Sequence, residues 1–272
     1  MNTILIPTNF SENSYRIVDY VIELFKNESC AFYLFNSYSY GVKGLDAIEL
    51  LQADEEWFEI PEEESLKKLE KLLDYYKLKS NNVNHTFYTV SKSIDLVDGI
   101  KEILEKIGAN LLILTGNIEK IIGKNNEHIL GKIRNIPILI IPPTASSNEK
   151  LNLTIVSDFK QKLSTIDIDI FCKVFENTNF EVKILVLEFQ NELTIQAANN
   201  LESLIINLKQ EVSIEYIKLT FSFIDYIAFD LEGIICIVDE NPDLFRIVGL
   251  TKSNLTSKIE NSYSNPVLVL HQ

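Results

Sequence analysis

ILIPTNF at residues 4–10 and LTIVSDF at residues 153–159 are two versions of one sequence pattern. In each copy an apolar run ends in a hydroxyl residue, then Asn or Asp, then Phe. A short, nearly continuous apolar run is typical of a strand that is buried on both faces of a parallel sheet. The two copies therefore predict that one structural unit occurs twice along the chain.

The first half of the chain alternates short apolar runs with longer stretches of helical periodicity. Ser11 is a plausible N-cap for the first helix, and Gly108 follows the third helix, where a glycine commonly ends one. This alternation predicts βαβ units and a parallel sheet. We expect strands at 3–7, 30–36, 85–90, 110–115 and 137–141, and helices at 11–26, 63–79, 94–107 and up to 133.

The second half repeats this order, with strands expected at 153–159, 180–189, 212–219, 233–239 and 266–270. The spacing before the last strand provides a check. Gly123-Lys124 lies 13 to 14 residues before Pro137, and Lys252-Ser253 lies 13 to 14 residues before Pro266. The sequence therefore predicts an internal duplication, with domains at 1–144 and 149–272 and a polar linker at 145–148.

The last strand of each half is short and apolar, PILII at 137–141 and PVLVL at 266–270. An unpaired apolar strand at a sheet edge promotes aggregation. Pairing or packing these two edges removes that risk. We therefore expect the halves to form an intramolecular pseudo-dimer, present as a monomer or as a homodimer.

An acidic insert at about 37–62 distinguishes the first half from the second. Nine acidic residues and no basic residue lie between positions 46 and 66, interspersed with Leu51, Trp57 and Phe58. One interpretation is a solvated loop and helix start, with Trp57 covering the end of its own sheet. The other is an acidic and aromatic surface that docks a protein partner.

Composition excludes several classes of protein. Among 272 residues, 39 acidic residues outnumber 25 basic ones for a net charge of −14, which argues against nucleic-acid or anionic-membrane partners. No apolar run approaches the roughly 18 residues of a membrane span, and the N-terminus does not read as a signal peptide. The three cysteines, at 30, 172 and 236, predict free buried thiols and a cytoplasmic location.

The sequence combines ILIPTNFS at 4–11, the strand order, Gly116 after the fourth strand and the run from Gly123 to IPILIIP. In these features the chain resembles the universal stress protein family. The resemblance covers essentially the full length as a tandem pair and is stronger in the first half. It implies two doubly wound, five-stranded parallel-sheet α/β domains of the adenine nucleotide alpha hydrolase-like type. It also implies a nucleotide cleft at the carboxyl ends of the strands. Many members bind ATP there and dimerise through the last strand, whereas in others the cleft is empty.

The phosphate loop departs from the family pattern. Glycines in such a loop let backbone N–H groups approach phosphates at a helix N-terminus. Here Gly116 and Gly123 are seven positions apart, about half the family's interval, and the middle glycine is missing. Glu119 lies inside this shortened loop, and Lys124 takes the place of the family's hydroxyl residue.

These residues leave two interpretations open. The glycines are either ordinary turn positions or part of a residual nucleotide or anion site, in which Lys124 replaces some lost backbone contacts. Asn9 stands where the family carries an acid, which Asp158 keeps in the second half, and Asp239, Glu240 and Asp243 predict an empty second cleft. We expect ATP binding to be lost or at least ~100-fold weaker than with a full loop. The candidate residues are Thr8, Asn9, Gly116, Gly123, Lys124 and Asn126.

Catalytic chemistry has little support in the sequence. The three histidines, at 85, 128 and 271, lack metal-ligand spacing, and no Gly-x-Ser-x-Gly nucleophile motif is present. The leading hypothesis is a non-catalytic stress-response protein without cofactor or metal that acts through protein contact. The alternative is a regulatory switch that binds ATP or AMP in the first-domain cleft. A hydrolytic enzyme is the least favoured hypothesis.

Overall fold

The computed structural model describes eight stretches of the chain. Side chains at 55–58, 124 and 218 lie outside the description. The eight described stretches are residues 1–40, 55–116, 124–146, 151–188, 194–208, 211–218, 233–238 and 265–271. All structural statements below refer to these eight stretches.

Strands and helices alternate in both halves, as the periodicity predicts. The first half contains β1 (Asn2–Pro7), α1 (Glu12–Leu24), β2 (Cys30–Tyr38), α3 (Glu55–Lys79), β3 (His85–Ser93), α4 (Leu96–Ile107), β4 (Leu111–Thr115), α5 (Lys124–Lys132) and β5 (Ile138–Ile141). The second contains β6 (Leu151–Ser157), α6 (Thr165–Lys173), β7 (Phe180–Glu188), α7 (Ile195–Asn207), β8 (Val212–Lys218), β9 (Ile234–Val238) and β10 (Val267–Leu270).

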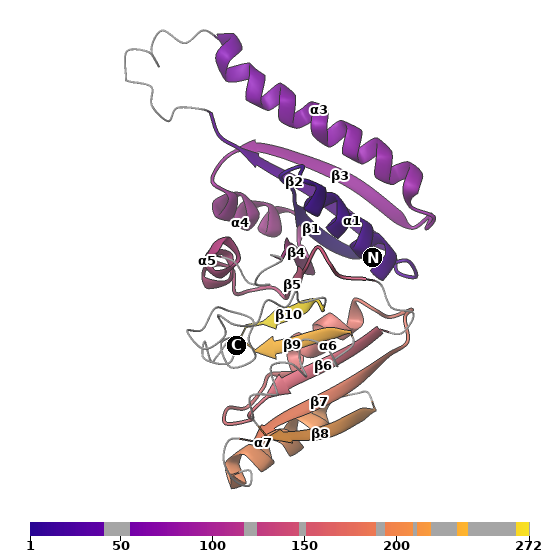
Figure 1. Ribbon diagram of the computed structural model, residues 1–272, viewed down its shortest axis with the longest axis vertical. Helices are drawn as coiled ribbons and strands as arrows, with labels where there is room; N and C mark the ends of the chain where they lie inside the picture. The colour runs from indigo at the N-terminus through magenta and orange to yellow at the C-terminus, as the bar shows by residue number, and fades with distance from the viewer. Residues whose placement is uncertain are drawn as a thin grey trace.

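A single ten-stranded sheet joins the two halves, in the order β3-β2-β1-β4-β5-β10-β9-β6-β7-β8. Within each half all strand pairs are parallel, and β5 pairs with β10 antiparallel, with Leu139 opposite Leu268. Reading outward from this central pair, both halves have the same order (Figure 1). The predicted fold class, two tandem doubly wound units packed as a pseudo-dimer, is therefore confirmed.

The structure confirms the two helix ends that the sequence predicts at Ser11 and Gly108. The Ser11 hydroxyl accepts a hydrogen bond from the backbone N–H of Ser14 at 3.3 Å, as an N-cap does. Gly108 has the left-handed backbone, φ 59°, that ends α4, a conformation that costs other residues more than glycine.

The largest difference from the sequence prediction is the start of α3. The helix begins at Glu55 and contains Pro61, although the prediction began it at residue 63. A proline inside a helix loses its N–H bond and its ring crowds the carbonyl four residues earlier, so the helix continues through Pro61 at a cost. Residues 55–62 of the predicted insert are thus helical. Residues 41–54 lie outside the description, and the domain limits at 144 and 149 stay a prediction.

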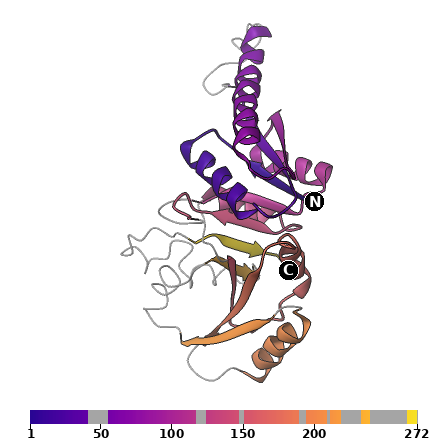
Figure 2. The same ribbon diagram turned by 90° about the vertical axis from the view of Figure 1, so that its right-hand side faces the viewer.

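Helices cover both faces of the sheet, and one apolar core is continuous across the halves. It contains Val18 of α1, Leu72 of α3, Phe171 of α6 and Leu201 of α7, all buried. A second core on the other face holds α4 and α5 against the sheet. Figure 2 shows the halves stacked along the long axis with β10 between them.

The turns after α1 and α6 also join the halves. The rings of Phe25 and Phe175 stack with centroids 4.8 Å apart. The buried carboxylate of Glu28 accepts hydrogen bonds from the backbone N–H of Asn177 at 2.9 Å, from its side-chain amide at 3.0 Å and from the Thr178 hydroxyl at 2.8 Å. This contact connects residues about half the chain length apart.

Candidate functional site

A small cleft lies at the carboxyl ends of β1, β2 and β4, where open parallel sheets generally bind ligands. Its volume is about 270 Å³. Polar lining residues come from the β1 turn, the first turn of α1, the end of β2, the end of β4 and the first turn of α5. They are Thr8, Asn9, Ser14, Asn36, Ser37, Thr115, Asn125 and Asn126; Pro7, Leu96, Leu114 and Ile129 complete the lining.

The turn after β1 places Thr8 and Asn9 at this cleft. Phe10 has a left-handed backbone, φ 60°, and its N–H donates to the Thr8 hydroxyl at 3.2 Å. The Asn9 amide oxygen accepts from the Ser14 hydroxyl at 2.6 Å and from the N–H of Ser11 at 3.1 Å. Asn9 therefore uses its oxygen to hold the turn, and its side-chain NH₂ is the group that it can offer a ligand.

Asn126 connects α5 to the sheet from the opposite wall of the cleft. It is buried, and its side-chain NH₂ donates to the carbonyl oxygen of Thr115 at 3.1 Å. The structure thus brings three of the predicted residues, Thr8, Asn9 and Asn126, around one cleft.

Gly116 lies just after β4, and its backbone N–H takes part in the pairing of β4 with β5. Gly116 is buried, and its N–H donates to the carbonyl oxygen of Ile141 at 2.7 Å. That N–H is thus used within the sheet rather than offered to a phosphate. Gly123 and Glu119 lie outside the described residues, as does the side chain of Lys124.

The charge of the cleft follows from its lining. Every residue that the structure places in the lining is uncharged. Among the described lining residues, a triphosphate would meet hydroxyl and amide groups rather than lysine or arginine side chains. This described part of the lining suits hydrogen bonds to a neutral polar group better than neutralisation of several negative charges.

Sequence reasoning missed Asn36, which links the cleft to α3. Its side-chain NH₂ donates to the carbonyl oxygen of Thr8 at 2.8 Å, and the Ser65 hydroxyl donates to its amide oxygen at 2.7 Å. Ser65 also lies 2.6 Å from the Ser91 hydroxyl of β3. The available signal was a polar residue at the end of the apolar run CAFYLF. A buried, hydrogen-bonded chain of this kind fixes side-chain positions.

The second half repeats the turn but not its charge. Phe159 has φ 54°, its N–H donates to the Ser157 hydroxyl at 3.0 Å, and Asp158 accepts from the N–H of Lys160 at 3.1 Å. Asp158 also forms an ion pair with the Lys160 ammonium at 2.9 Å. The acids at 239, 240 and 243 lie outside the described residues.

The histidines do not gather. His85 is buried beside Phe32, with its ring hydrogen-bonded to the Ser80 hydroxyl and the Phe25 carbonyl, and burial lowers its pKa. His128 is exposed on α5, and His271 is buried near Asp167. In the described parts of the chain, no three His, Cys, Asp or Glu side chains are grouped to hold a metal ion.

The thiols are poor nucleophiles in this setting. Burial raises the pKa of Cys30 and of Cys172 to about 12, and Cys236 is fully buried with a raised pKa. A thiol with a raised pKa remains protonated at neutral pH. Within the described ranges, none of the helices has the length and apolar character needed to cross a bilayer.

Comparison with known proteins agrees with this architecture. No family model and no curated protein matches the sequence. The crystal structure of a universal stress protein from Archaeoglobus fulgidus DSM 4304 matches with a TM-score of 0.69 at 15% identity, over 99% of this chain and 98% of that one. The chain has the universal stress protein fold. The resemblance inferred from the sequence is confirmed at the level of the fold.

Two shorter structures match about half of the chain. A hypothetical protein has 25% identity and a TM-score of 0.42, and a protein of the universal stress protein family from Burkholderia pseudomallei has 15% identity and a TM-score of 0.33. Each covers 52% of this chain and 96% of its own. In the universal stress protein fold of this chain, the cleft at β1, β2 and β4 is the position to test for ligands.

Proposed function

We propose that this protein is a non-catalytic stress-response protein of the universal stress type that acts through protein contact, with a degenerate nucleotide cleft. The observation that carries the proposal is the uncharged lining of the cleft in the described residues, together with the use of the Gly116 N–H inside the sheet. No described lining residue is a His, Asp, Glu, Lys or Cys, so the described part of the lining offers no group for general acid–base chemistry.

The partner surface in this proposal includes the acidic segment of residues 46–66 around Trp57. The described end of this segment is accessible to a partner, because Glu62, Glu63 and Glu64 are exposed on α3. The same helix carries Ser65, which reaches the cleft through Asn36. Changing the three glutamates to glutamine should weaken capture of the partner while the thermal midpoint stays the same. We also propose a cytoplasmic location, since three free thiols persist most readily in a reducing compartment.

Isothermal titration with ATP and AMP tests the state of the cleft. We expect ATP binding to be absent or at least ~100-fold weaker than in a protein with the complete loop, which corresponds to about 2.7 kcal/mol. Mass spectrometry of the denatured protein should release no stoichiometric nucleotide. Micromolar ATP affinity would overturn the degenerate-cleft proposal, and turnover of ATP would overturn the non-catalytic one.

A second candidate is a switch that binds ATP or AMP in the first-half cleft. The observation that favours this switch is that Thr8, Asn9 and Asn126 line the same cleft. Asn126→Ala separates the two candidates, because it removes a cleft wall residue without adding charge. Nucleotide binding that falls at least about tenfold in this variant supports the switch.

A further inference from the structure

The turn regions at the amino ends of the strands differ between the halves in a way that suggests a second binding site. FKNESC at residues 25–30 and FENTNF at residues 175–180 occupy the same place, between the first helix and the second strand of each half. Asp19 lies six residues before Phe25, and Asp169 lies six residues before Phe175. Each aspartate lines a hollow beside its turn.

The hollow of the first half is neutralised by the chain's own lysines. Its two carboxylates are Asp19 and Glu23. Asp19 pairs with the Lys79 ammonium of α3 at 2.6 Å, and Glu23 pairs with Lys26 at 2.7 Å. A cation from another molecule would therefore have to displace an internal one.

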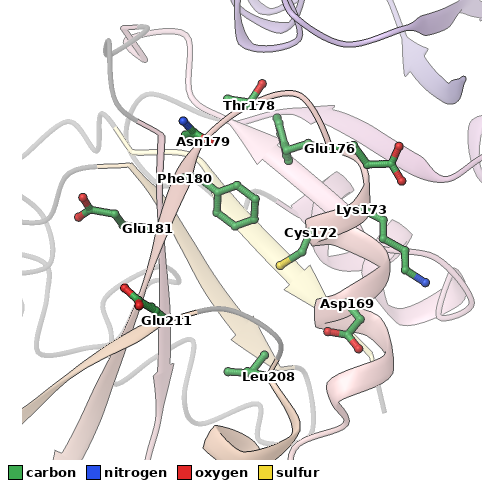
Figure 3. A pocket seen from close by; sticks show the side chains of 11 residues that line it. Asp169, Cys172, Lys173, Glu176, Thr178, Asn179, Phe180, Glu181, Leu208 and Glu211 are labelled. Carbon is green, nitrogen blue, oxygen red and sulfur yellow. The ribbon is translucent and has the colours of Figure 1, made fainter.

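In the second half the groove has an apolar centre. Phe180 stands where the first half has Cys30, and Cys172 stands where it has Ile22. The volume of the groove is about 580 Å³, and Leu208 at the end of α7 forms part of its lining. Figure 3 shows the Phe180 ring and the Cys172 thiol in the middle, with carboxylates toward the periphery.

The rim of this second-half groove is acidic. Asp169, Glu176, Glu181 and Glu211 line it, and Lys173 is the one basic residue among the described lining residues. No described cation pairs with Asp169, in contrast to Asp19. Lys209 follows Leu208 in the sequence but lies outside the described residues.

We propose that the second-half groove docks a lysine or arginine side chain from a basic segment of a partner protein. The cationic head pairs with Asp169, as Lys79 pairs with Asp19 in the first half, and the aliphatic stem lies over Phe180 and Leu208. Long cationic side chains bury their methylene groups on apolar surface while the charged head remains in contact with water. The carboxylates of Asp169, Glu176 and Glu211 attract a basic segment and set its orientation.

This surface is separate from the acidic segment of residues 46–66. It rests on the proposed function only in assuming that the protein works by protein contact. Nucleotide titration therefore does not test it, and its failure would leave the degenerate-cleft proposal untouched.

The experiment measures binding of a fluorescein-labelled hexapeptide of alternating lysine and leucine to the full chain by fluorescence anisotropy. Comparison probes are the same peptide with glutamate in place of lysine, and spermidine as an unlabelled competitor. We expect the lysine peptide to bind at low salt and to be released at roughly 0.5 M salt, whereas the glutamate peptide should not bind. Backbone amide shifts should map the lysine peptide to residues around Asp169 and Phe180.

Matched variants make the test specific to the groove. Asp169→Asn should weaken the lysine peptide about fivefold, and Glu211→Gln should weaken it less. Asp19→Asn removes the equivalent, internally paired charge and should leave the affinity unchanged. Equal losses in Asp169→Asn and Asp19→Asn would overturn the proposal, because the peptide would then be sensing net charge alone.

The remaining outcomes also decide the proposal. Spermidine that displaces the peptide at equal concentration indicates a small-cation site and overturns the protein-segment assignment. Peptide shifts that map away from the groove, or no binding by a chain that melts normally, overturn it as well.

Discussion

The two halves of this molecule share a backbone fold but stabilise equivalent turns and helix surfaces with different charged and polar side chains. After the first strand, the turn in the first half is held by the neutral Asn9, and that in the second half by Asp158 in an ion pair with Lys160. Beside the first helix, Asp19 is paired internally, whereas Asp169 is not paired with any described cation. The backbone geometry of a turn therefore persists while its charge changes, because the hydroxyl and Asx contacts need only an oxygen acceptor.

Breaking the contact between the halves should give the largest effect. Phe25→Ala removes a fully buried ring that stacks on Phe175, and we expect a loss of about 3–5 kcal/mol in the free energy of unfolding. Phe175→Ala should cost a similar amount. In the double variant the losses should fall short of additive by about 0.5–1.5 kcal/mol, measured by urea denaturation. Strict additivity would mean that the stack contributes nothing beyond burial.

The buried Glu28 gives the next largest effect. Glu28→Gln turns one acceptor oxygen into a donor that faces the donors of Asn177 or Thr178, so we expect about 1–3 kcal/mol of destabilisation. Glu23→Gln is the matched control, since its pair with Lys26 is half exposed and should change stability by at most about 0.5 kcal/mol. Equal effects in the two variants would contradict the assignment of Glu28 as the polar contact between halves.

His85 makes the first half sensitive to acid. Burial lowers its pKa in the folded chain, so the unfolded chain binds a proton more readily. Its contribution to stability is therefore present above the ordinary histidine pKa of about 6.5 and is lost as the pH falls below it. Thermal midpoints measured across this range should fall with acid more steeply in the native chain than in His85→Asn. Parallel curves would show that other groups carry the acid sensitivity.

The smallest expected effect comes from the pair that closes the first-half hollow. Lys79→Met keeps the aliphatic stem but removes the ammonium from Asp19, and the two side chains are about 40% exposed. We expect at most about 0.5 kcal/mol of destabilisation, and none for Lys173→Met on α6, the basic residue in the described lining of the second-half groove. The informative readout is binding, because Lys79→Met should give the first-half hollow an uncompensated carboxylate and measurable affinity for the lysine peptide.

The sequence predicts the fold well because strand burial and helix periodicity are local signals. The run at 4–10 fixes both the strand and its turn, and Ser11 and Gly108 mark helix ends through their own backbone preferences. The predicted start of α3 at residue 63 was wrong. Consecutive acids at 62–64 suit a helix N-terminus, but the helix begins at Glu55 and continues through Pro61.

The candidate site was only partly predictable. Thr8 and Asn9 could be placed because they follow the first predicted strand, and Asn126 because it lies at the start of a predicted helix. The use of the Gly116 N–H by Ile141 could not, since it depends on the pairing of β4 with β5. The role of Glu28 as a contact between the halves could not be predicted from the sequence, because its three hydrogen-bond donors belong to residues 177 and 178 in the other half of the chain.

The antiparallel pairing of β5 with β10 has a consequence for how this molecule behaves on dilution and over evolutionary time. Two separate subunits joined by such a pair would dissociate as their concentration falls, whereas strands tethered in one polypeptide meet at a fixed effective concentration. A symmetric dimer must also carry every substitution twice. Tethering removes that constraint, so the two halves can differ in charge without disturbing the shared sheet, as Asp19 with Lys79 and Asp169 without a described cation do.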